Sequence, residues 1–132
     1  MTTLDDFQKL VARETGLSIV STLRANNTIQ SSVVNAGVLD GNVAFVARGG
    51  AKKVANLHAR PRVTVVIRSG WEWVAVEGNA ETRGPDGVAQ LLRDIFTAAG
   101  GTHDNWEEFD RVMANEGRVA VLITPDRVYS HG

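Results

Sequence analysis

The chain has 132 residues, a formal net charge of −1 and no cysteine, and 43% of its residues are hydrophobic. This is the size of one domain with a real hydrophobic core, so we expect a single domain over residues 1–132. The lack of cysteine excludes a disulfide framework, a thiolate zinc site and a cysteine nucleophile. The near-zero net charge provides no global field that would favour nucleic acid as a partner.

The first elements are predicted to be a helix and a hairpin. Apolar residues recur at helical spacing over residues 4–15, and Gly16 follows as a stop signal. Residues 17–24 and 28–35 are rich in β-forming residues and flank the turn pair Asn26-Asn27, which predicts two paired strands.

The middle of the chain alternates strands with one short helix. A strand is predicted at residues 43–47, and a helix at residues 52–59 ends before Pro61. Two more strands are predicted at residues 62–68 and 71–82.

The last part of the chain predicts two helices and a closing strand. One helix is expected to begin at Pro85 and a second after the capping pattern at residues 104–107. Strand follows at residues 118–124 and 127–129. Six strands with small helices and short connections predict a mainly β, α+β fold with an antiparallel sheet or small barrel. A parallel sheet would require helical crossovers that the sequence lacks.

Charge is unevenly distributed along the chain. No Asp or Glu occurs from Gly41 to Trp71, whereas acidic residues gather after residue 103. The same stretch carries six basic residues: Arg48, Lys52, Lys53, Arg60, Arg62 and Arg68. Such a segment in a nearly neutral protein predicts a discrete anionic ligand rather than a long polyanion. The alternative is a solvated surface that pairs with the acidic residues.

The segment Ala47–Leu57 (ARGGAKKVANL) places two glycines and two lysines between a predicted strand and a predicted helix. A helix N-terminus presents unpaired N–H groups and a partial positive charge, and glycine lets the backbone approach a ligand. Arg48 and Lys53 add full charges, so we interpret this corner as a phosphate site. The alternative is an ordinary strand-to-helix turn with solvated lysines.

Other sites of common chemistry are not predicted. The three histidines are far apart in sequence and none has a ligand at i+3 or i+4, so no metal site is expected. The chain contains no G-x-S-x-G elbow, no Walker A loop and no G-x-G-x-x-G after a strand. We therefore expect no catalytic side-chain constellation.

Four segments together resemble the split β-barrel flavin- and deazaflavin-dependent oxidoreductases of the pyridoxamine 5'-phosphate oxidase-like superfamily. They are IQSSVVN (residues 29–35), RGGAKK (residues 48–53), NLHARPR (residues 56–62) and GWEWVAVEG (residues 70–78). The sequence is most similar to the actinobacterial branch that uses the deazaflavin coenzyme F420. The resemblance implies a six-stranded split barrel of the FMN-binding type that forms a homodimer, with cofactor sites at the interface.

The resemblance also implies the cofactor-binding residues. Arg48 and Lys53 would hold the cofactor phosphate, the backbone that follows Arg48 would add N–H groups, and Gln30, Ser31 and Ser32 would line the ring system. Trp71 and Trp73 would close the pocket, in their own or in the other subunit. The full set is Gln30, Ser31, Ser32, Arg48, Gly49, Gly50, Ala51, Lys52, Lys53, Trp71 and Trp73. Core or dimer packing is the alternative role for the tryptophans.

The implied activity is transfer of a hydride from the reduced deazaflavin to a small conjugated organic substrate, with a proton from solvent, Tyr129 or His131. The chain departs from pyridoxamine phosphate oxidases because it lacks their basic C-terminal segment, so vitamin B6 oxidation is not expected. FMN in place of F420, or a non-catalytic cofactor-binding protein, are the alternatives. No signal peptide or apolar run of roughly 18 residues is present, so we expect a cytoplasmic protein without membrane insertion.

Overall fold

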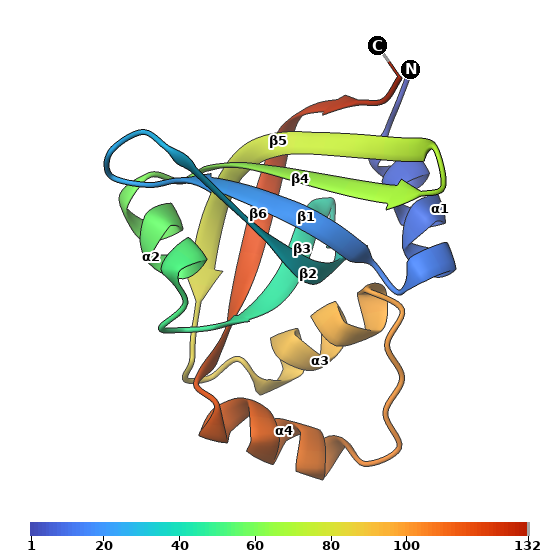
Figure 1. The fold of residues 1–132 in the computed structure, drawn as a ribbon. Coiled ribbons are helices and arrows are strands. Elements are labelled where there is room, and N and C mark those ends of the chain that lie inside the picture. Colours follow the sequence, from blue (N-terminus) through green and yellow to red (C-terminus); the bar gives the residue numbers. More distant parts are fainter. Residues whose placement is uncertain (132) are drawn as a thin grey trace.

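Six antiparallel strands close into a barrel in the order β1-β2-β3-β6-β5-β4 in the computed structural model, which describes residues 1–131 (Figure 1). The strands are β1 (Leu17–Leu23), β2 (Ile29–Leu39), β3 (Asn42–Arg48), β4 (Arg62–Ser69), β5 (Glu72–Arg83) and β6 (Arg118–Tyr129). The helices are α1 (Leu4–Glu14), α2 (Lys52–Ala59), α3 (Ala89–Ala98) and α4 (Trp106–Asn115). The predicted mainly β architecture is confirmed.

The helix ends follow local chemistry, and two differ from prediction. Thr15 and Gly16 adopt positive φ angles of 53° and 66°, and α1 ends there as predicted. The third helix begins at Ala89 rather than Pro85, because a turn with positive φ at Gly84 and Gly87 precedes it. The cap of α4 is Asn105, whose Oδ1 accepts a hydrogen bond from the Glu108 N–H at 3.1 Å, one residue later than the predicted pattern.

Hydrophobic side chains form two clusters. The larger fills the barrel and includes fully buried Phe45 and Ile67. The smaller lies where α3 and α4 cover the outer side of β3 and β6, and it includes Leu92, Ile95 and Phe109. Among residues 1–131, no helix combines the length and apolar character needed to cross a bilayer.

The barrel is split between β2 and β3. These strands pair only from Ala36 to Leu39 against Asn42 to Phe45. The N-terminal half of β2 pairs with β1 alone, and it diverges from the end of β3 toward α2 (Figure 1). The split therefore exposes one edge of β2 beside the residues that lead into α2.

Candidate functional site

The corner between β3 and α2 has free backbone donors. Gly49 N–H donates to Gly117 O at 2.9 Å and Ala51 N–H donates to Arg48 O at 3.0 Å. The amides of Gly50 and of the first two residues of α2 have no hydrogen-bond partner among the described residues, and no side chain caps the helix. Nothing lies within 4 Å of where a Cβ would stand at Gly50. The backbone is therefore open to an anion.

Three charged side chains meet beside these amides. The Arg48 side chain is 63% exposed, and its Nη2 lies 3.3 Å from Glu116 Oε2. Arg118 Nε donates to Glu116 Oε1 at 3.1 Å. Arg48 and Arg118 are also cross-strand partners of β3 and β6. The sequence analysis missed Arg118, because only the strand register brings it beside Arg48.

The predicted ring-lining residues of β2 do not share one face. Asn56 Nδ2 donates to Gln30 Oε1 and to Thr22 Oγ1, both at 3.1 Å, so Gln30 faces α2. Ser31 lies on the outer face, where its Oγ is 2.9 Å from Ser21 Oγ. Strand alternation returns Ser32 to the side of Gln30. Two of the three residues therefore face the split.

Trp71 and Trp73 lie at the β4–β5 turn, at the opposite end of the barrel from α2 (Figure 1). Trp71 is 93% exposed. Trp73 packs edge-on against Tyr129, with ring centroids 6.1 Å apart, and lies 5.5 Å from the His131 ring. Within one chain the tryptophans are therefore separated from Arg48.

The two candidate proton donors are engaged in this aromatic group. The Tyr129 hydroxyl donates to Glu77 Oε2 at 2.8 Å, and this carboxylate raises the pKa of the tyrosine. His131 Nε2 lies 3.0 Å from Trp71 O. Either group could serve a reaction only at this end of the barrel or in a partner subunit.

The arginines of the basic stretch beyond α2 already have partners. Arg60 Nε donates to Leu23 O at 3.0 Å, and Arg68 Nη1 donates to Gly70 O at 2.9 Å. Arg62 binds Asp126 through both Nη atoms, and this hydrogen bonding lowers the pKa of the Asp126 carboxyl. Much of the positive charge in the stretch is therefore neutralised or fixed away from the corner.

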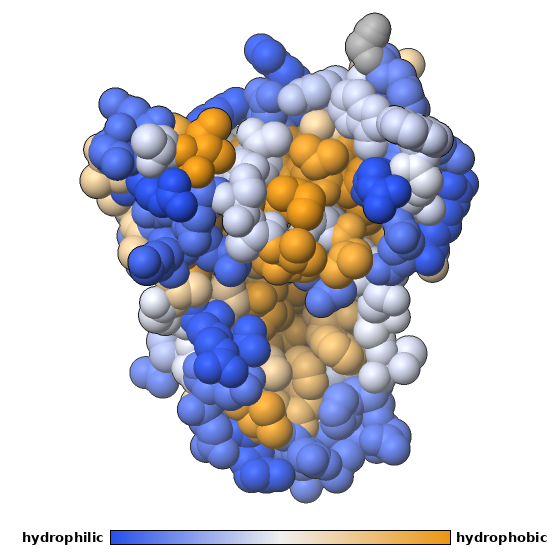
Figure 2. Space-filling view, in the orientation of Figure 1, coloured by the Kyte–Doolittle hydropathy of each residue, from blue (hydrophilic) through white to orange (hydrophobic). Residues whose placement is uncertain are grey.

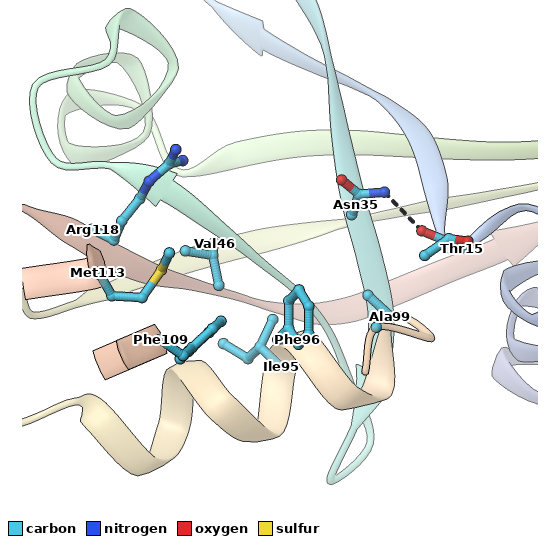
Figure 3. Close-up of a pocket in the computed structure, with 10 residues that line it drawn as sticks. Thr15, Asn35, Val46, Ile95, Phe96, Ala99, Phe109, Met113 and Arg118 are labelled. Atoms are coloured by element: carbon cyan, nitrogen blue, oxygen red, sulfur yellow. Dashed lines mark hydrogen bonds between the residues drawn. The ribbon is translucent and has the colours of Figure 1, made fainter. Parts of the chain in front are cut away.

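A hollow of about 330 Å³ lies between the outer side of β3 and the helices α3 and α4. Its walls include Val46, Ile95, Phe96, Phe109 and Met113 (Figure 3). No predicted cofactor residue lines it. Most of these residues have the helical spacing of ordinary core positions, and nothing in that spacing indicates that they leave a space.

An apolar row crosses the outside of five strands. The strand registers align Val33 with Ile19, Ile19 with Val66, Val66 with Ala75 and Ala75 with Tyr129. Ile19 and Val33 are 44% and 58% exposed. Figure 2 shows apolar surface over β1, β2 and β4 on this side of the barrel. Ala75 is only 1% exposed, so the accessible part of the row lies over β2, β1 and β4. An exposed apolar patch of this kind is typical of an interaction surface.

A family model described as pyridoxamine 5'-phosphate oxidase matches residues 4–132. The chain belongs to this family. Members of the pyridoxamine 5'-phosphate oxidase family include oxidoreductases, and the fold binds flavin-type cofactors. Among residues 1–131, no group of three or more His, Asp or Glu side chains is placed to hold a metal ion.

The structure is similar to several solved structures with the same fold. A conserved hypothetical protein of Mycobacterium tuberculosis has a TM-score of 0.77 and 20% identity, over 98% of this chain and 84% of that chain. A protein described as an F420 reductase has a TM-score of 0.70 and 17% identity, over 92% and 94%. General Stress Protein 26 of Bacillus anthracis has a TM-score of 0.68 and 17% identity, over 96% and 92%. These similarities show the split-barrel fold.

Proposed function

We propose that this protein binds the deazaflavin coenzyme F420 and is an oxidoreductase that reduces a small conjugated organic substrate. The observation that carries the proposal is the corner at the start of α2. The amides of Gly50, Lys52 and Lys53 have no partner among residues 1–131 there, and they follow closely in sequence on the exposed guanidinium of Arg48. Backbone donors and fixed cations together suit one phosphate group next to a ring system.

The residues present fit such a cofactor. Gly50 keeps the backbone accessible, Gly49 lets the chain pass close to Gly117, and the Gln30 side chain faces the split beside α2. When bound, a reduced deazaflavin supplies a hydride, that is, a proton together with two electrons. The protein binds the phosphate, orients the ring in the split and limits water near it. The proton that completes reduction of the substrate comes from solvent.

The proposal includes a homodimer. The apolar row, together with Trp71 at 93% exposure, supports a partner surface on the outside of β1, β2 and β4. Trp71 and Trp73 lie at the opposite end of the barrel from their own chain's corner. In the proposal they therefore close the cofactor pocket of the partner subunit.

FMN is the second candidate cofactor, because it also carries a phosphate near a planar ring and the same corner would hold it. F420 has a polyglutamate tail that FMN lacks, and such a tail favours free basic residues along a groove; Arg60, Arg62 and Arg68 are the candidates, with ordinary surface as their alternative role. These arginines are already engaged by Leu23, Asp126 and Gly70. The preference for F420 therefore rests on the sequence resemblance and not on a tail site.

The test is a parallel titration of the protein with F420 and with FMN, followed by tryptophan fluorescence. Saturable quenching at low micromolar F420, with weaker FMN binding, is the expected result. Tight binding of FMN alone would assign the protein to the flavin-using members. No response to either compound would contradict the proposal. Turnover of the reduced cofactor then separates an enzyme from a cofactor-binding protein.

The dimer has its own test. Ile19→Glu places a charge in the centre of the apolar row and should convert the protein to a monomer in sedimentation velocity. Ala12→Glu, at an exposed position of α1, is the matched control. A monomeric wild-type protein would contradict the homodimer and the role of the tryptophans at a partner's site.

A further inference from the structure

The hollow beside the corner is built as a ring-binding pocket. Phe96 and Phe109 lie 5.0 Å apart between ring centroids, and both line the hollow with Met113. Val46 of β3 forms the opposite wall (Figure 3). Aromatic faces and a thioether are favourable contacts for a planar conjugated ring. A volume of about 330 Å³ is within the range of small-molecule sites.

Packing outside the hollow holds its walls in place. A Cβ at Gly37 would overlap the backbone of Ala98, so glycine is what allows α3 to lie directly against β2. Arg93 binds Asp110 through Nε at 2.9 Å and Nη2 at 2.5 Å, which ties α3 to α4. The Arg93 guanidinium also lies 5.6 Å from the ring centroid of Trp106. These contacts fix α3 against β2 and α4 against α3, so the walls of the hollow are held in place by the protein itself.

The two ends of the hollow are polar. Figure 3 shows Arg118 at one end and Asn35 at the other, with the apolar side chains between them. The Arg118 Nε is used by Glu116, but its two Nη groups have no hydrogen-bond partner in the described part of the chain. Asn35 Nδ2 donates to Thr15 O at 2.8 Å, which fixes the amide plane. An anionic oxygen at the Arg118 end is therefore the complementary group.

We propose that this hollow binds the substrate of the proposed reaction, and that the substrate is a planar conjugated ring bearing a carboxylate. The ring lies between Val46 and the aromatic side chains of α3 and α4, and the carboxylate binds Arg118. This inference rests on the proposed function for the substrate role. The hollow adjoins the cofactor corner, because Arg118 and Arg48 are cross-strand partners, yet no residue expected to bind the cofactor lines it.

The test measures binding of 2-naphthoate, a redox-inert probe of this class, by isothermal titration calorimetry without cofactor. Val46→Phe fills the hollow and should weaken 2-naphthoate by about tenfold or more. Arg118→Gln should weaken the binding of 2-naphthoate by about tenfold and leave the affinity for the uncharged 2-naphthalenemethanol unchanged. Ala12→Phe, on the exposed side of α1, is the control and should bind like wild type. F420 titrations of each variant run in parallel.

The possible outcomes separate the two proposals. If Val46→Phe loses binding of 2-naphthoate and retains its affinity for F420, the substrate pocket is supported. If the folded Val46→Phe variant loses binding of both ligands, the hollow is the cofactor's ring site and the inference is overturned. Wild-type-like 2-naphthoate binding in both variants would also overturn it. If 2-naphthoate binds in the hollow but no protein binds F420 or FMN, the substrate role is overturned together with the proposed function.

Discussion

Two parts of one basic stretch differ in what their charges can do. Lys52 and Lys53 begin α2 with no ion pair among residues 1–131, beside unpartnered amides. Arg62 lies in β4, ten positions after Lys52; it is bound by Asp126 and lies 3.7 Å from Glu77 Oε1. In the sequence these residues belong to the same stretch without acidic residues. In the barrel, Glu77 of the adjacent strand β5 and Asp126 of β6, the strand beyond it, reach Arg62, and neither pairs with the lysines.

The difference shows that the number of basic residues in a segment does not give the positive charge that is available to bind a ligand. A carboxylate within hydrogen-bonding distance satisfies an arginine and reduces its attraction for a further anion. The start of α2 lacks such a carboxylate except for Glu116, which reaches Arg48 from the end of α4. The predictions below test this contrast between a free and a neutralised set of cations.

The largest effect is expected from Lys53→Glu. The change replaces a cation beside the open amides with an anion, so F420 affinity in the fluorescence titration should fall by about 100-fold. Lys9→Glu reverses a charge on α1, where the side chain is 74% exposed, and is the matched control. Binding like wild type in Lys53→Glu would remove the phosphate assignment.

Glu116→Gln should increase the affinity for an anion at the corner. The carboxylate now holds both Arg48 and Arg118, and a neutral amide would release the charge of Arg48 to the cofactor phosphate. We expect F420 to bind about three- to tenfold more tightly, measured by the same titration. Glu108→Gln on α4 is the control. Weaker binding in Glu116→Gln would mean that the carboxylate orients Arg48 for the ligand rather than competing with it.

Asp126→Asn tests the ion pair that neutralises Arg62, through the pH dependence of thermal stability. Arg62 lowers the pKa of the folded carboxyl, so its contribution to stability is present above the unfolded pKa of about 3.9 and is lost as pH falls through the lower folded value. The wild-type Tm should therefore exceed that of Asp126→Asn at neutral pH, and the difference should shrink below about pH 4. Asp86→Asn, at an exposed carboxylate, is the control. An equal difference at every pH would exclude the ion pair as its cause.

The smallest effect on ligand binding is expected from Arg62→Met. Because its charge is already paired, F420 affinity should stay within about twofold of wild type. Lys52→Met, which removes a cation next to the open amides, should weaken F420 several-fold in the same assay. Equal losses of F420 affinity in the two variants would show that the ligand interacts with cations along the whole stretch. The contrast between paired and unpaired cations would then be wrong.

Much of the fold could be predicted from hydrophobic period and turn residues. The bounds of α2 follow from Pro61, which stops the helix, and from the helical spacing of the residues before it. The strands follow from β-rich runs between glycine and asparagine turns. The start of α3 was misplaced because Pro85 is a common first helical residue but here belongs to a turn with Gly84 and Gly87.

The site was less accessible to sequence reasoning, because it depends on registers between distant strands. The corner at residues 48–53 is continuous in sequence and could be located, although its ligand remains a prediction. Arg118 lies beside Arg48 only through the pairing of β3 with β6. The alternation of Gln30 and Ser31 about the split was in principle foreseeable from the two-residue period of a strand.

The incomplete pairing of β2 with β3 has a consequence for amide hydrogen exchange. Between Gln30 and Asn35 the strand is bonded to β1 on one edge only. Alternate amides therefore point toward the split without a ladder partner and should exchange rapidly with solvent, while their neighbours are protected. Exchange rates along these six residues would then report, amide by amide, how deeply any molecule entering the split shields the exposed edge.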